Sequence, residues 1–167
     1  ESIVIPAGKS ITIDLNSMSI TGTMPKGIGV VENNGTLTIQ NGTISSTAIN
    51  GGAAVLNKGT LTITDATVNG APSNTATGTA SYAVNSQGIG SKLVVNNSTI
   101  IGRGAIAATK GTKVVLNGGT YHTPAVAWGH AVYATNEGTE VVINAGIFSE
   151  GYEMSANNWG MYQIYSG

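Results

Sequence analysis

The chain of 167 residues is long enough for one domain with a sizeable core, since 41% of its residues are hydrophobic. Charged residues make up only 9%, and the net charge of −1 argues against a nucleic-acid partner, which needs a basic face. No apolar run has the length that a transmembrane helix requires, so we expect no membrane insertion. The absence of cysteine excludes a disulfide framework.

One short segment recurs six times along the chain. Each copy alternates apolar and polar residues, which is typical of a half-buried β-strand. The copies occupy residues 11–20, 36–44, 60–68, 92–100, 113–121 and 140–148. Aligned on Leu15, Ile39, Ile63, Val95, Leu116 and Ile143, successive copies lie 21 to 32 residues apart. The residues two positions earlier are predicted to point inward as well: Ile13, Leu37, Leu61, Leu93, Val114 and Val141.

A second apolar stretch precedes most copies and ends at a turn rich in asparagine and glycine, as in Val55-Leu56 before Asn57-Lys58-Gly59. Each repeat therefore holds three short strands and no helical pattern. One repeat cannot bury its apolar face alone, whereas stacked repeats bury inward residues in continuous columns. We predict an all-β, right-handed, single-stranded parallel β-helix of about seven coils, with residues 1–167 forming one domain and a segment of a longer chain. A β-sandwich with accidental similarity between strands is the alternative.

The opening residues 5–16 (IPAGKSITIDLN) and the motif NGTLTI at residues 34–39 resemble pectin-lyase-like β-helix repeats. More narrowly, they are similar to repeats of phage fibre proteins and bacterial surface adhesins. Fibres of this kind are commonly trimers, which the resemblance implies for this chain. The same family includes polysaccharide lyases and hydrolases, so the fold alone does not decide the function.

Alignment of the repeats also aligns the outward residues, which stack about 4.8 Å apart as coils do. One outward column is predicted to be a hydrogen-bonded ladder: Asn16, Gln40, Thr64, Asn96, Asn117 and Asn144. Another column ends in three valines, Val94, Val115 and Val142. Because an exposed apolar stripe often marks an interface, we predict that these valines form a subunit contact in a trimer. Cover by a loop, or by chain outside these residues, is the alternative. Uncapped terminal coils expose unpaired backbone groups, so end-to-end joining into a fibre is the other predicted form of self-association.

Catalysis requires groups that the chain does not bring together in an obvious way. Hydrolysis of a glycosidic bond uses two carboxyl groups at a set separation, but Asp14 and Asp65 fall in different columns about 10 Å apart along the axis. The family resemblance implies clustered acidic calcium ligands for a lyase, whereas Arg103 has no aspartate near it. His122 and His130 lack the spacing of a metal site. We therefore predict no catalytic residue, no metal site and no cofactor.

Eight of the nine aromatic residues lie within residues 121–167. Tyr121 and Phe148 fall at an inward repeat position and are predicted to belong to the core. The long connections 122–130 and 149–159 leave the coil at one corner, where aromatic rings could stack on a sugar while carboxylates and amides bind its hydroxyls. The predicted glycan site comprises His122, Trp128, His130, Glu150, Tyr152, Glu153, Asn157, Asn158 and Trp159. Local packing of these rings is the alternative.

The sequence therefore favours a non-enzymatic structural and adhesive module of an extracellular or virion fibre that binds surface glycans. A polysaccharide lyase or glycoside hydrolase with its site in the corner loops is one alternative. A bacterial cell-surface adhesin repeat is the other. Each of these readings places the protein outside cells, on a cell surface or on a virion surface.

Overall fold

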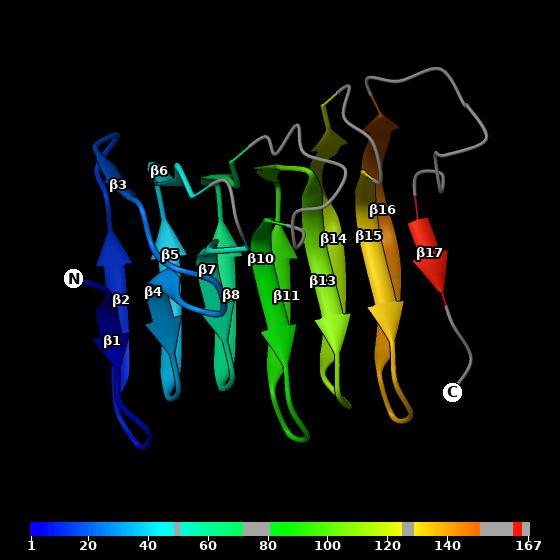
Figure 1. Ribbon diagram of the computed structural model, residues 1–167, viewed down its shortest axis with the longest axis horizontal. Helices are drawn as coiled ribbons and strands as arrows, with labels where there is room; N and C mark the ends of the chain where they lie inside the picture. Colours follow the sequence, from blue (N-terminus) through cyan, green and yellow to red (C-terminus); the bar gives the residue numbers. More distant parts are fainter. Residues whose placement is uncertain (49–50, 72–80, 125–128, 151–161, 165–167) are drawn as a thin grey trace.

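The computed structural model describes residues 1–48, 51–71, 81–124, 129–150 and 162–164, which form parallel strands and turns (Figure 1). None of these residues is helical. The strands lie side by side along the longest axis of the molecule, with the N-terminal coil at one end and the C-terminal strand at the other (Figure 1). The predicted all-β parallel solenoid is confirmed.

Two sheets face each other across the core. The seven-stranded sheet contains β1 (Ile3–Ile5), β4 (Gly29–Asn33), β7 (Ala53–Asn57), β10 (Tyr82–Gln87), β13 (Gly104–Thr109), β15 (His130–Thr135) and β17 (Tyr162–Ile164). The opposite sheet begins with β2 (Ser10–Asp14), β5 (Thr36–Gln40), β8 (Thr60–Thr64), β11 (Lys92–Asn96), β14 (Lys113–Thr123) and β16 (Glu140–Glu150). It continues around a corner through β3 (Ser19–Gly22), β6 (Thr43–Ser46), β9 (Thr67–Asn69) and β12 (Ser98–Ile101), which the second half of β14 joins.

The described strands make about five turns, so the prediction of about seven coils was too high. The prediction of three short strands in every coil was also incomplete. In the last two coils the second and third strands merge into β14 and β16, each of 11 residues. Gly118 and Gly119 lie inside β14 with φ of 122° and 97° and carry the strand around the corner.

The inward columns form one continuous core. Leu37, Leu61, Leu93 and Val114 stack in register and are no more than 1% exposed, as predicted. Tyr121 and Phe148 are also inward as predicted, and their rings stack with centroids 4.8 Å apart. In the last coil, Ile143 lies in register with Leu116 but is 47% exposed, because no described strand packs over β16 on its far side.

The predicted register was wrong by two residues in the first coil. Leu37 pairs with Ile11 and Ile39 pairs with Ile13, whereas the repeat alignment had matched them to Ile13 and Leu15. The first coil has two more residues between its second and third strands than the second coil has, as β2 ends at Asp14 and β3 begins at Ser19. The repeat alignment had not allowed for these two additional residues, so it shifted β2 by two positions relative to β5.

The predicted outward ladder is confirmed from Thr64 to Asn144. Asn144 donates to Asn117 (2.8 Å), Asn117 to Asn96 (3.0 Å) and Asn96 to Thr64 (3.2 Å). Gln40 instead donates to Asp14 (2.8 Å), which takes the place predicted for Asn16. Asn16 lies in the turn after β2 with a φ of 45°.

A second polar ladder is buried where the two sheets join. The Asn33 side chain donates to Asn57 Oδ1 (2.8 Å), and Asn57 donates to Ser86 Oγ (3.0 Å). The Ser86 hydroxyl in turn lies 2.8 Å from the hydroxyl of Thr112. All four residues are fully buried. Because each side chain bonds the next coil, this ladder fixes how successive coils stack.

Candidate functional site

The predicted glycan site at the corner loops is described only in part. Trp128, Tyr152, Glu153, Asn157, Asn158 and Trp159 lie outside the described residues, as does the side chain of Glu150 at the end of β16. His122 lies in β14, and its Nδ1 is 2.9 Å from the hydroxyl of Ser149 in β16. His130 lies in β15 of the opposite sheet, in register with Gly104. The structure thus places the two histidines on different sheets.

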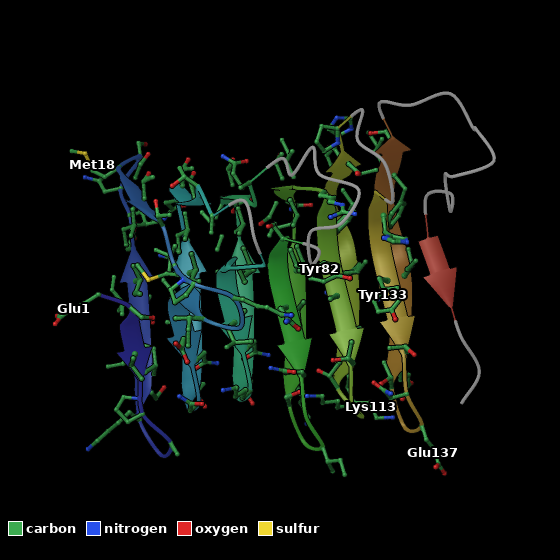
Figure 2. The ribbon with its side chains drawn as sticks, viewed as in Figure 1. Glu1, Met18, Tyr82, Lys113, Tyr133 and Glu137 are labelled. Carbon is green, nitrogen blue, oxygen red and sulfur yellow. The ribbon has the colours of Figure 1, made fainter. Side chains whose placement is uncertain are left out.

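His130 belongs instead to an aromatic cluster on the seven-stranded sheet. The rings of Tyr82 in β10 and Tyr133 in β15 are stacked, with centroids 6.3 Å apart and planes 24° apart. The His130 ring lies 5.6 Å from the Tyr133 ring. Figure 2 shows the two tyrosines on this sheet, on either side of β13. Tyr82, Tyr133, His130 and Arg103 are called the tyrosine cluster below.

Gly104 in β13 allows the two tyrosines to approach each other. It lies between Tyr82 and His130 in the strand register. A Cβ atom at this position would lie 2.1 Å from a ring carbon of Tyr82, so no other residue fits without moving the ring. The Tyr82 ring therefore lies over Gly104 of β13, in the direction of Tyr133 in β15.

Electrostatics keep Tyr82 protonated. Burial, reinforced by the nearby Tyr133 and opposed by Arg103, raises the pKa of Tyr82 from 10.0 to about 12. The Arg103 residue is buried, which lowers the pKa of its guanidinium, and its backbone carbonyl accepts hydrogen bonds from the His130 amide (2.8 Å) and the Thr123 hydroxyl (3.0 Å). Two partly exposed rings beside a buried cation form a surface that can stack on the C–H face of a sugar.

Sequence reasoning missed Tyr82 and Arg103 as members of this cluster. The predicted glycan site drew only on residues 121–167, where eight of the nine aromatic residues lie, and Tyr82 is the ninth. The signal lay in the apolar stretches that precede each repeat. Alignment of Ala83-Val84 with Ala131-Val132 would have placed Tyr82 and His130 in the same column.

No protein-family model, no curated protein and no solved structure matches the chain. The assignment to the β-solenoid class therefore rests on the strand pairing of the chain itself.

The two aspartates of the chain, Asp14 and Asp65, lie in a hydrogen-bonded ladder and in a turn. Asp14 accepts hydrogen bonds from Gln40, from the Asn16 backbone amide and from Asn41, and these bonds lower its pKa. A carboxyl group held in its ionised form is poorly suited to act as a general acid. Asp65 occupies the turn between β8 and β9 with a φ of 49°.

Among the described residues, no three acidic, histidine or cysteine side chains form a group that could hold a metal ion. The same part of the chain has no helix that could cross a membrane.

The predicted valine stripe is present as a column on the opposite sheet. Val94, Val115 and Val142 pair directly in adjacent strands, and Val142 is 39% exposed. In the coils below, the same column continues as Thr62 and Thr38. The apolar surface is therefore confined to three successive coils. Beside it, Lys113 and Glu140 form an ion pair at 2.5 Å, and both side chains are about half exposed.

Proposed function

We propose that the chain is a non-enzymatic structural and adhesive module of an extracellular or virion fibre, built from repeats like those of phage fibre proteins and bacterial surface adhesins. The observation that carries this proposal is the valine stripe on the outside of a stacked rod. Val94, Val115 and Val142 align along the rod axis, so two rods can bring their stripes together over several coils.

The tyrosine cluster supports the adhesive part of the proposal. Tyr82 and Tyr133 lie on the sheet opposite the stripe, so association through the valines leaves the rings accessible. A stacked pair of partly exposed tyrosines suits the apolar face of a sugar ring. The fibre would thus use one sheet for assembly and the other for contact with a surface glycan.

Light scattering on the intact protein tests the assembly. We expect a mass of three times 16.8 kDa for the unmodified chain of 167 residues. Replacement of the three valines by lysine adds three like charges to the stripe and should give a folded monomer. The matched control replaces Thr12, Thr38 and Thr62, from the same column in the other coils, by lysine and should leave the mass unchanged. A monomeric unmodified protein, or equal dissociation in both variants, would refute the valine contact.

A further inference from the structure

The turns that join the two sheets stack along one edge of the rod. This edge carries five lysines: Lys9 in the first coil, and Lys58, Lys92, Lys110 and Lys113 in three successive coils further along the rod. It carries two carboxylates, Glu137 and Glu140, both in the following coil. Five positive charges against two negative ones leave a surplus of three, although the whole chain has a net charge of −1. We call Lys58, Lys92, Lys110 and Lys113 the basic edge.

The charge of three of these lysines is not neutralised locally. Lys113 is paired with Glu140 at 2.5 Å. Within the described part of the chain, no carboxylate lies within ion-pair distance of Lys58, Lys92 or Lys110. Lys92 also pairs in register with Lys113, so two like charges occupy adjacent strands. Directly opposed like charges are unfavourable, and a bound anion would relieve their repulsion.

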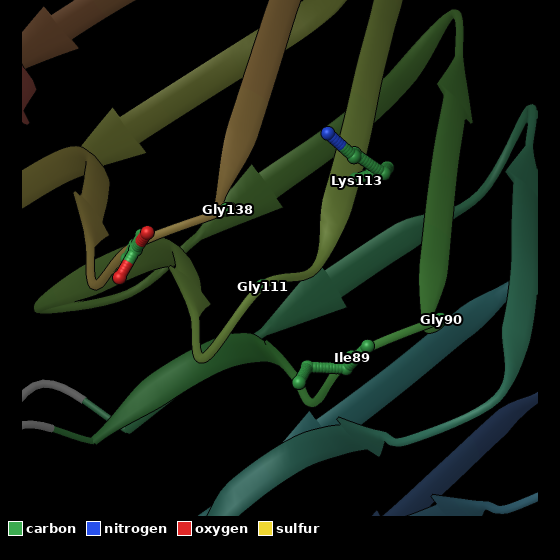
Figure 3. A pocket seen from close by; sticks show the side chains of 6 residues that line it. Ile89, Gly90, Gly111, Lys113 and Gly138 are labelled. Carbon is green, nitrogen blue, oxygen red and sulfur yellow. The ribbon is translucent and has the colours of Figure 1, made fainter.

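The basic edge is hollowed. A cavity of about 270 Å³ is lined by Lys58, Gln87, Gly88 and Lys110. A neighbouring cavity of about 410 Å³ is lined by Ile89, Gly90, Gly111, Lys113, Glu137 and Gly138 (Figure 3). Both cavities are open to solvent, so an extended ligand could pass from one to the other along the rod.

An exposed isoleucine stands between the two cavities. Ile89 is 96% exposed at the tip of a turn whose flanking glycines, Gly88 and Gly90, have φ of 108° and 85°. The Ile89 side chain lies beside Gly111, where a Cβ atom would come within 3.1 Å of it. This turn adds an apolar contact to a surface that is otherwise basic and polar.

We propose that the basic edge binds an acidic polysaccharide, a chain that carries carboxylate or sulfate groups along its length. Lys58 and Lys110 are two coils apart, about 9.6 Å along the axis. Their spacing suits a polymer with repeated charges, because several weak contacts along one chain act together. Ile89 meets the apolar face of a sugar between the charged groups. Single-stranded nucleic acid fits less well, since such sites stack bases on aromatic rings and the described turns of this edge carry none.

This proposal deepens the adhesive role and rests on it, but it concerns residues other than the valine stripe and the tyrosine cluster. The two proposals can therefore fail separately. The valine-to-lysine variant changes the oligomeric mass, whereas variants of the basic edge change ligand affinity at constant mass.

The test measures binding of the intact protein to polygalacturonate and to dextran sulfate, with neutral dextran as the uncharged polymer. We expect the two acidic polymers to bind and dextran to bind at least about tenfold more weakly, with affinity for the acidic polymers falling as NaCl rises from about 50 to 200 mM. The double variant Lys58→Gln, Lys110→Gln should lower affinity by about tenfold and flatten the salt dependence, because fewer counterions are released on binding. Ile89→Ser should weaken binding without changing the salt dependence.

The control is Lys26→Gln, which removes one charge from the turn between β3 and β4, at a different corner of the rod. It should bind as the unmodified protein does, and thermal unfolding should be the same for all variants. An equal loss of affinity per charge removed in the control would show that only net charge matters, and would overturn the proposal. Equal binding of neutral dextran, or tighter binding of a single-stranded oligonucleotide than of either acidic polysaccharide, would overturn the proposal.

Discussion

The buried ladder of Asn33, Asn57, Ser86 and Thr112 makes Asn57 the most informative residue to replace. The Asn57 side chain uses four hydrogen bonds. It donates to Ser86 Oγ (3.0 Å) and the Lys92 carbonyl (2.9 Å), and it accepts from Asn33 Nδ2 (2.8 Å) and the Gly59 amide (3.2 Å). Asn33 keeps a second acceptor in the Thr60 carbonyl, and Ser86 keeps Thr112. Replacement by alanine thus removes a bond from two backbone groups, those of Gly59 and Lys92.

An unsatisfied buried polar group costs about 1–3 kcal/mol, so we expect Asn57→Ala to lower the free energy of unfolding by about 3 kcal/mol. With a urea m-value of about 2 kcal/mol/M, the midpoint would fall by about 1.5 M. The control is Asn117→Ala in the exposed ladder, which loses two side-chain hydrogen bonds that water can replace. That change should cost less than about 1 kcal/mol. Equal midpoints for the two variants would refute the claim that the buried ladder fixes the stacking of the coils.

Two further predictions test the register and the tyrosine cluster. Leu61 is fully buried in a central coil, so Leu61→Asp should abolish cooperative unfolding because it buries an unpaired charge. Thr62→Asp, one residue further along and outward, should lower the free energy of unfolding by about 1 kcal/mol or less. Circular dichroism in urea compares the two variants, and equal destabilisation would show that the strand faces are reversed. Tyr82 ionises near pH 10 when unfolded and near 12 when folded, so stability should fall as the pH rises from about 10 to 12. Tyr82→Phe should reduce this loss of stability at high pH, as measured by urea unfolding at each pH, while phenolate absorbance follows the ionisation itself. An unchanged loss of stability in the variant would contradict the raised pKa.

Period-2 alternation predicted the fold because it reports directly on which residues face the core. Leu61 and its neighbours in the column are inward for this reason. The same pattern could not set the register of the first coil, since it does not show on which side of a strand additional residues fall. The structure places them in the turn between β2 and β3.

Contacts between coils were harder to predict than contacts within them. Asn33 and Asn57 appeared in the sequence as turn residues, and their burial follows only from the stacking of one coil on the next. Tyr82 and Tyr133 are 51 residues apart and meet because Gly104 leaves space between them. Of the histidines in the predicted glycan site, His130 joins this cluster and His122 pairs with Ser149 on the other sheet.

Incubation of the protein with acidic and neutral glycans tests most directly whether the rod binds glycans without cleaving them. The amount of glycan bound to the protein is measured, and mass spectrometry gives the chain length of the glycan. The account predicts retention of acidic polysaccharide at unchanged chain length, with retention lost in the variant Lys58→Gln, Lys110→Gln. The appearance of new reducing ends or unsaturated products, growing with time and protein concentration, would contradict a non-enzymatic adhesive module.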